Sequence, residues 1–244
     1  RYRITDGRFT TCKPGQDDWF VGAEQLDLDF QRQIGTARGA NVSFLGVSTP
    51  RIPWFDFSLD NQRKTGLLPP TFGVAKRNGA EFAQPFYWNI APEYDATITP
   101  RYMERRGLQV LNEFRYLQPT FRGEARGEIL PDDKVINERR WAYALLHNYI
   151  NPQRGLSGYW NIQRASDDSY FRDLSSRLSV ATQTFLPADV SLTYGSGVGG
   201  LWNVTGRAQT WQTLQDPLNP VQEPYNLAAQ KALASVQGRR GLWF

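Results

Sequence analysis

Apolar and polar residues alternate along much of this chain, in segments whose length and two-residue period are those of β-strands. From residue 79 onward the segments are roughly ten residues long and are separated by short polar breaks, as is typical of transmembrane β-strands. The pattern predicts strands near residues 79–88, 94–103, 108–118, 120–130, 140–150 and 156–165, and less sharply near 177–195 and 201–213.

The alternation is clearest between residues 120 and 130, where one set of side chains is small or apolar and the other is charged. The first set is Phe121, Gly123, Ala125, Gly127 and Ile129, and the second is Arg122, Glu124, Arg126 and Glu128. An arginine that faced lipid at mid-depth would cost roughly 2–4 kcal/mol, so we expect the four charges to face water or a lumen.

Residues 140–150 alternate in the same way, but the sequence leaves open which of their two sets of side chains meets lipid. One set is Trp141, Tyr143, Leu145, His147 and Tyr149. Aromatic residues near predicted strand ends, namely Trp88, Trp141, Tyr159 and Trp202, suit a belt at a membrane interface. The alternative is that they fill the core of a soluble sandwich.

The first part of the chain reads as short strands broken by turn residues, with no helical periodicity. The predicted strands are residues 8–12, 19–29, 34–37, 41–44 and 47–54. Leu26, Leu28 and Phe30 alternate with Asp27 and Asp29, as expected of a half-buried strand in a sandwich or jelly roll. The polar, proline-containing stretch 58–70 is the expected linker, which predicts one domain over residues 1–66 and another over 67–244.

The stretch from Pro85 to Gly107 predicts a β-hairpin, because β-branched and aromatic residues occupy both arms and residues 89–93 suit a turn. Pro85 and Pro100 fall inside the two predicted arms, and each removes a backbone donor. We therefore expect two neighbouring strands that pair imperfectly.

Composition narrows the choice of environment. The 244 residues are 40% hydrophobic, enough for a core, while a mean hydropathy of -0.53 and the absence of a long apolar run exclude a transmembrane helix. A bilayer crossing would then need a closed barrel. The net charge of +4 comes mostly from arginine, which favours an anionic partner, but no basic stripe predicts nucleic-acid binding. The chain starts at Arg1 without a leader, so we expect a piece of a longer or processed protein.

Short motifs follow one another in a characteristic order between residues 8 and 175. They are TTCKPG at 10–15, RKTGLLP at 63–69, NIAP at 89–92, DATITP at 95–100, RRG at 105–107, NEFRYL at 112–117, LPDDK at 130–134, and SDD with YF at 166–171. In these motifs the chain resembles the outer-membrane LPS-assembly proteins of the LptD, or organic-solvent-tolerance, family.

The resemblance implies an all-β chain. In that family residues 1–66 would be the C-terminal part of a periplasmic β-jelly roll, and residues 67–244 the first antiparallel strands, about eight, of a large outer-membrane β-barrel. It implies that lipopolysaccharide arrives from a periplasmic bridge of LptA-type jelly-roll proteins and that an LptE-type lipoprotein plugs the barrel. The lipid would then leave through a lateral gate into the outer leaflet, among the outer-membrane lipids.

The resemblance also assigns roles to individual residues. Pro85 and Pro100 would weaken the lateral gate. Cys12 would form a disulfide with a cysteine near the C-terminus of the family's proteins, a partner that is absent from this chain, in which Cys12 is the single cysteine. No cofactor is expected, because the driving force would be supplied upstream.

The residues predict neither an enzyme nor a metal site. His147 is the single histidine and reads as a packing residue. The acidic pairs Asp17-Asp18, Asp132-Asp133 and Asp167-Asp168 fall in predicted turns, where they would cap the backbone or, as the alternative, bind a cation loosely. Two other functions stay open: a general outer-membrane channel, which would need no weakened strands, and a soluble carbohydrate-binding β-sandwich.

Overall fold

The computed structural model describes residues 1–10, 12–13, 18–44, 46–48, 51–59, 63–175, 184–195, 202–216, 218 and 231–238. These residues form almost only β-strands: β1 (Tyr2–Phe9), β2 (Trp19–Asp29), β3 (Ile34–Phe44), β4 (Val47–Ser48), β5 (Ile52–Ser58), β6 (Gly66–Leu67), β7 (Thr71–Ala75), β8 (Gly79–Ala83), β9 (Phe86–Ala91), β10 (Tyr94–Met103), β11 (Gly107–Leu117), β12 (Phe121–Asp133), β13 (Glu138–Asn151), β14 (Leu156–Ala165), β15 (Phe185–Gly195), β16 (Trp202–Thr213) and β17 (Lys231–Gly238). A 3-10 turn (Pro152–Arg154) and a short helix, α1 (Tyr170–Leu174), complete the elements. The predicted all-β class is confirmed.

The chain divides into two compact units. The first comprises Arg1–Pro69 together with Phe86–Asn89, and the second comprises Pro70–Pro85 together with Ile90–Phe244. The chain therefore passes from the second unit to the first at Pro85 and Phe86, and back again within β9.

The first unit contains an antiparallel sheet in which β1 pairs with β2, β2 with β3, and β3 with both β4 and β5. Leu26 lies opposite Ile4 on one side and Ala37 on the other, so these apolar side chains share a face. Asp27 points to the other face, where its carboxylate accepts hydrogen bonds from Arg3 Nε at 2.7 Å and Gln25 Nε2 at 2.6 Å. Strand β3 runs unbroken through residues that the sequence pattern assigned to a break at 38–40.

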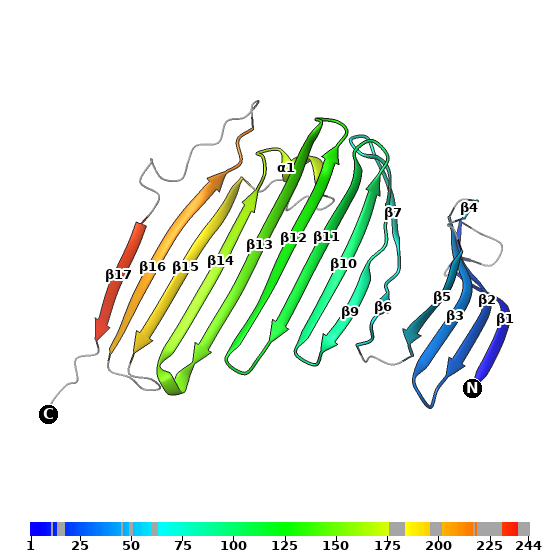
Figure 1. Cartoon of the computed structure of the whole chain (residues 1–244), viewed down its shortest axis with the longest axis horizontal. Coiled ribbons are helices and arrows are strands. Elements are labelled where there is room, and N and C mark those ends of the chain that lie inside the picture. The colour runs from blue at the N-terminus through cyan, green and yellow to red at the C-terminus, as the bar shows by residue number, and fades with distance from the viewer. Residues whose placement is uncertain are drawn as a thin grey trace. The chain divides into compact units, whose positions relative to one another are not determined.

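A larger antiparallel sheet follows the order β17-β16-β15-β14-β13-β12-β11-β10-β8-β7, with β9 also paired to β10 (Figure 1). Neighbours in sequence are neighbours in space, as in a meander. The strands predicted near 94–103, 108–118, 120–130, 140–150 and 156–165 are all present within a few residues of their predicted ends.

Three details of the second unit differ from the predicted pattern. The strand predicted over 79–88 is two strands, β8 and β9, with a break at Gln84 and Pro85. Strand β15 begins at Phe185, and the earlier part of the prediction for 177–195 falls mostly on residues outside those described. The composition of residues 226–236 suits a helix or a strand, and residues 231–238 form β17, which is one of these alternatives. The predicted turn at Asp167-Asp168 is followed directly by the helix α1.

The two faces of the large sheet differ in polarity. Because residues opposite one another on paired strands share a face, the register from β10 to β16 separates two sets of side chains. The apolar face carries Ile98, Tyr102, Leu108, Phe114, Ala125, Ile129, Trp141, Tyr143, Leu145, Ile162, Val190, Leu192 and Val204, and among them the polar residues Asn112 and Arg164. The polar face carries Asp95, Thr97, Arg101, Glu113, Arg115, Arg122, Glu124, Arg126, Glu128, Asn148, Gln163, Asp189 and Arg207.

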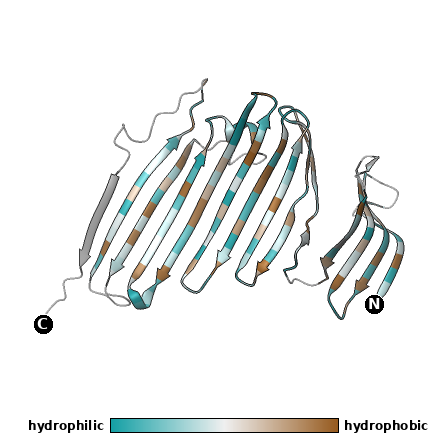
Figure 2. Cartoon of the chain, viewed as in Figure 1, coloured by the Kyte–Doolittle hydropathy of each residue, from teal (hydrophilic) through white to brown (hydrophobic). Residues whose placement is uncertain are grey.

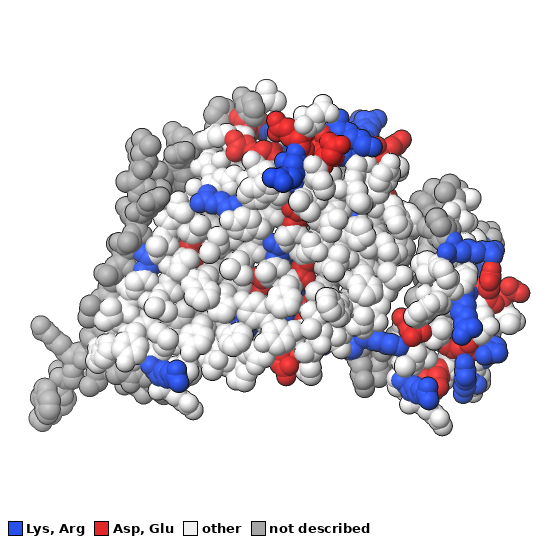
Figure 3. Space-filling model, viewed as in Figure 1, with Lys and Arg blue, Asp and Glu red and all other residues white. Residues whose placement is uncertain are grey.

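Hydropathy follows this division. Figure 2 shows hydrophobic and hydrophilic residues alternating along the strands, and Figure 3 shows a broad, mostly uncharged surface over the sheet with charged side chains gathered at the end that carries α1. Many large apolar side chains are exposed on the apolar face, among them Leu108 and Leu192, each at 52%. A surface of this kind needs an apolar environment or a partner to cover it.

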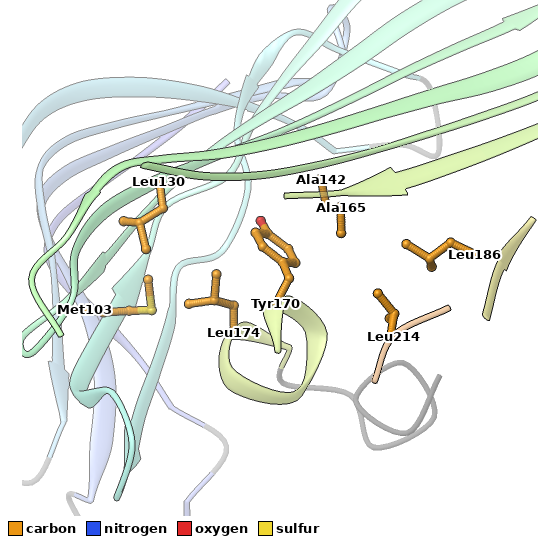
Figure 4. Packing of buried hydrophobic residues seen from close by; sticks show 8 residues of the cluster. All are labelled: Met103, Leu130, Ala142, Ala165, Tyr170, Leu174, Leu186 and Leu214. Carbon is orange, nitrogen blue, oxygen red and sulfur yellow. The ribbon is translucent and has the colours of Figure 1, made fainter. Parts of the chain in front are cut away.

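The buried core of this unit lies under α1. It consists of Met103, Leu130, Ala142, Ala165, Tyr170, Leu174, Leu186 and Leu214 (Figure 4). Two of these side chains, Tyr170 and Leu174, come from α1, and Met103, Leu130, Ala142 and Ala165 come from strands β10, β12, β13 and β14. Of the helices among the described residues, none is long and apolar enough to cross a membrane.

Candidate functional site

Pro100 leaves the pairing of β8 with β10 incomplete. The backbone N–H of Gln84 donates to the carbonyl oxygen of Pro100 at 3.1 Å. Two residues opposed in this way normally exchange two such bonds, but proline has no N–H to return. On its other side Pro100 lies opposite Val110 of β11. The missing donor therefore faces the line of β8 and β9.

Pro85 does not lie inside a strand, so the prediction that placed it within an arm was wrong on this point. It follows Gln84 in the break between β8 and β9. Successive residues of an extended chain point their backbone groups to opposite sides, so the nitrogen of Pro85 faces away from β10 when that of Gln84 faces toward it. Pro85 thus ends β8 rather than removing a second bond to β10.

A buried arginine links the ends of several strands to α1. Arg140, on β13, is 1% exposed, and all five of its N–H groups have acceptors. Nε and Nη2 donate to the two carboxylate oxygens of Asp167 at 2.9 and 2.6 Å, Nη1 donates to Asp133 at 3.1 Å and Asp173 at 3.2 Å, and Nη2 also donates to Ser169 Oγ at 3.1 Å. Asp167, Ser169 and Asp173 all belong to the segment around α1.

A second arginine extends this cluster to the start of β8. Arg106 Nη1 donates to Asp133 Oδ2 at 2.6 Å, and its Nε donates to Asn78 Oδ1 at 2.9 Å. Its Nη2 also lies 3.8 Å from Asp173 Oδ2. Asp133 is fully buried between the two guanidinium groups. We call Arg106, Asp133, Arg140, Asp167 and Asp173 the charged cluster.

Tyr170 attaches α1 to the middle strands. Its hydroxyl donates to Glu128 Oε2 at 2.9 Å and accepts from Gln109 Nε2 at 3.1 Å. Burial raises the pKa of Tyr170, and the charge of Glu128 raises it further, so the hydroxyl keeps its proton. The ring also lies 5.5 Å from the Arg140 guanidinium carbon.

The charged cluster was missed at the level of sequence. Asp133 and Asp167 were interpreted as turn caps, and they do accept from the backbone N–H groups of Val135 and Ser169 at 3.0 Å, but each is also ion-paired to Arg140. A signal was available in three of the motifs that carry the family resemblance. The motif RRG contributes the positive charge of Arg106, and the motifs LPDDK and SDD with YF contribute the negative charges of Asp133 and Asp167. The structure brings those three motifs together. Among the described residues no group of three or more potential ligands is arranged to hold a metal.

The residues predicted for an aromatic belt divide between the faces. Trp141 and Trp202 lie on the apolar face, where they contact Tyr143 and Tyr194 with ring centroids 5.7 Å apart in each pair. Tyr159 lies opposite Asn148 and Ser191 on the polar face, so its assignment to the belt was wrong.

Register shows which set of side chains in residues 140–150 lies on the apolar face. Gly123 lies opposite His147, so the set with Trp141, Leu145 and His147 is on the apolar face. A continuous row of rings crosses that face near the turns at residues 92–93, 118–120 and 152–155. The row consists of Tyr94, Phe114, Tyr116, Phe121, His147 and Trp160. The ring of His147 stacks on that of Trp160 at 4.2 Å, which agrees with a packing role.

Cys12 lies in a bend after β1, in the first unit. Its side chain is partly exposed, and its backbone N–H donates to Thr10 Oγ1 at 3.1 Å.

These observations define a class of protein: an all-β chain with an antiparallel sheet that is apolar on one face and charged on the other. Comparison with known sequences is more specific. Residues 138–231 match the sequence model of the family LptD, described as LPS transport system D.

The chain is 44% identical to the LPS-assembly protein LptD of Azoarcus sp. strain BH72 over 94% of its length, and 41% identical to that of Nitrosomonas europaea over 97%. It is 42% identical to that of Alkalilimnicola ehrlichii over 94%. The chain belongs to the LptD family. It spans 28%, 33% and 30% of the lengths of these three relatives, respectively.

Proposed function

We propose that this chain is part of an outer-membrane protein that assembles lipopolysaccharide at the cell surface. The proposal is supported by the names of the relatives, each an LPS-assembly protein LptD, and by the two-faced sheet. Exposed apolar side chains such as Leu108 and Leu192 would contact acyl chains, while the charges of Arg122 and Arg126 would face a wet lumen.

The two units suit different compartments in this proposal. The first, with its small antiparallel sheet and one apolar face, would be the end of a periplasmic β-jelly roll that receives lipopolysaccharide from an LptA-type bridge. The second would supply the first strands of the barrel. An LptE-type lipoprotein would occupy the lumen, where part of the polar face, including exposed Arg122, is open to a partner.

The observation that carries the release step is the unreciprocated bond from Gln84 to Pro100. A backbone hydrogen bond contributes about 0.5–1.5 kcal/mol net in water, and in hydrocarbon no water replaces a missing one. Strand separation therefore costs less here than along β11 to β16, where the pairing is regular except for a register shift between Leu130 and Asp133. The glycolipid would leave the lumen sideways near this weak pairing, which a general solute channel would not require.

The test replaces Pro85 and Pro100 by alanine in the full-length protein. The new N–H at residue 100 can donate to Gln84, so we expect slower appearance of lipopolysaccharide at the cell surface. Pro187→Ala is the matched control, because Pro187 lies inside β15, which is separated from β10 by the strands β11 to β14. With equal amounts of each variant in the membrane, unchanged surface lipopolysaccharide in the double variant would argue against the gate.

A disulfide from Cys12 to a cysteine elsewhere in the full-length protein is a further part of the proposal. Cys12 is partly exposed and is the single cysteine here, so its partner must come from another segment. Non-reducing electrophoresis of the full-length protein, with Cys12→Ser as control, would detect the cross-link as a shift in mobility that the control lacks.

A further inference from the structure

The contacts of β8 with β10 are concentrated on one side of the Gln84–Pro100 pair. Toward the turn at residues 76–78, Arg101 Nη2 and Nε donate to Glu81 Oε2 at 2.5 and 3.1 Å. The backbone N–H of Glu104 donates to the carbonyl of Ala80 at 2.9 Å, and the carboxylate of Glu104 accepts from the N–H of Ala80 at 2.9 Å. These residues face one another across neighbouring strands, so the pairing is strong here.

The segment around α1 holds the same strands from the polar face. Arg101 Nη1 donates to the carbonyl oxygen of Leu174 at 2.6 Å, at the last residue of α1. Arg77, in the turn between β7 and β8, donates to the carbonyl oxygen of Arg172. The last turn of α1 therefore offers the carbonyl oxygens of Arg172 and Leu174 to Arg77, in the turn before β8, and to Arg101, on β10.

The other side of α1 is fixed to the interior of the sheet. Asp167 and Asp173 bind Arg140 on β13, and Tyr170 binds Glu128 on β12. Leu174 packs in the buried core beside Met103 and Leu130 (Figure 4). A single short segment thus connects β7, β8 and β10 to β12 and β13, in addition to the bridge that Arg106 makes between Asn78 and Asp133.

We propose that α1 is a clamp, held by Asp167 and Asp173, that keeps the hairpin of β7 and β8 on the sheet. With the clamp in place, strand separation near Pro100 is confined to the side of the Gln84–Pro100 pair that lies away from α1. The interruption at Gln84 and Pro85 is then the hinge. The relevance of this clamp to lipid export rests on the proposed function, but the clamp itself is a mechanical property of the sheet.

Two exposed positions on the apolar face allow the clamp to be measured. Val74 on β7 is 89% exposed and Tyr143 on β13 is 44% exposed. Five strand pairings separate them, which places them about 24 Å apart across the sheet. Spin labels on cysteines at these positions, in a full-length protein whose free thiols have been replaced, report the separation by pulsed electron paramagnetic resonance.

The key variant is Asp167→Asn with Asp173→Asn. It removes the two carboxylates that α1 offers to Arg140 and leaves Asp133 to neutralise that arginine. We expect the distance distribution to broaden toward longer values. The matched control is Asp168→Asn, an exposed aspartate in the same segment, which should leave the distribution as narrow as in the parent.

A distribution in the double variant as narrow as that of the parent would overturn the clamp, as would equal broadening in the control. If the double variant does not assemble, Asp173→Asn alone is evaluated by the same criterion, since Asp133 and Asp167 still satisfy Arg140. The measurement is a distance, so its failure leaves the export result of the proline variants untouched. Failure of the proline variants to slow export likewise leaves the clamp intact.

Discussion

Tyr116 on β11 lies over Gly123 on β12, so closely that a Cβ added to the glycine would be 2.4 Å from the Tyr116 hydroxyl oxygen. That hydroxyl is 2.5 Å from Nδ1 of His147, on the next strand. Gly123 lies opposite both residues in the register. The tyrosine therefore spans β12 through the space that the missing side chain leaves, and it joins three strands on the apolar face.

Gly123→Ala is expected to destabilise the sheet. The new methyl group would meet the tyrosine ring and also the carbonyl oxygen of Leu146 at 2.5 Å, and overpacking of this kind costs roughly 1–3 kcal/mol. Gly127→Ala is the matched control on the same strand and face, because no atom lies within 4 Å of its added Cβ. Urea unfolding of the full-length protein in detergent measures both, and equal midpoints would contradict the contact.

Arg140→Met is expected to cost roughly 3–5 kcal/mol of stability, because it leaves buried Asp133 without one of its two cationic partners. Arg139→Met, at the exposed neighbouring position, should change stability by less than about 0.5 kcal/mol. The comparison uses the same unfolding measurement. Similar losses in both variants would mean that the charged cluster contributes nothing specific.

Acid is expected to loosen the segment around α1. Partial burial alone would raise the pKa of Asp167, but hydrogen bonds from Arg140, Ser166 and Ser169 outweigh it and lower the pKa. A lowered pKa means that the ionised carboxylate stabilises the folded state above the ordinary value of about 3.9, and that this stabilisation is lost as pH falls below it. Hydrogen exchange of the α1 amides, corrected for intrinsic rates, should accelerate below about pH 4.

Asp167→Asn is the control for this pH effect. The amide cannot ionise, so α1 should exchange faster at neutral pH and lose most of its acceleration in acid. A variant with the parent's pH profile would show that another group, not Asp167, controls the docking of α1.

The two faces of β14 should respond oppositely to charge. Ile162 lies on the apolar face opposite Leu145, and Gln163 lies on the polar face opposite Ala144. If the apolar face meets lipid as proposed, Ile162→Arg should cost roughly 2–4 kcal/mol, whereas Gln163→Arg should cost little. Folding of the two full-length variants into lipid vesicles measures the difference. Equal behaviour would mean that the apolar face is not in contact with acyl chains.

The strands could be predicted from sequence because their pattern is local. Residues 120–130 alternate so regularly that both the strand and the common face of Arg122 and Glu124 follow from a two-residue period. Residues 140–150 have two sets of similar polarity, so only pairing with β12 decides which set lies beside Gly123. Tyr159 was misassigned because only its pairing with Asn148 and Ser191 shows that it lies on the polar face.

The charged cluster could not be predicted because its members are distant in sequence. Arg106 and Asp173 are brought together only when four strands and a turn have formed between them. Nor does a proline motif state on which side of a strand its missing donor lies. Pro85 and Pro100 look equivalent in the sequence, but the hydrogen bond from Gln84 shows that only Pro100 withholds a bond from the pairing of β8 with β10.

Burial of Arg140 imposes an order on assembly. Its carboxylate partners include Asp133, made seven residues earlier, and Asp167 and Asp173, made later. Before residues 167–173 have docked, Arg140 on β13 has only one of its carboxylate partners, Asp133, nearby. Burial of the arginine at that stage would leave its charge incompletely paired. We therefore expect the end of the sheet near α1 to stay open to water until residues 167–173 dock and bring the remaining carboxylates to Arg140.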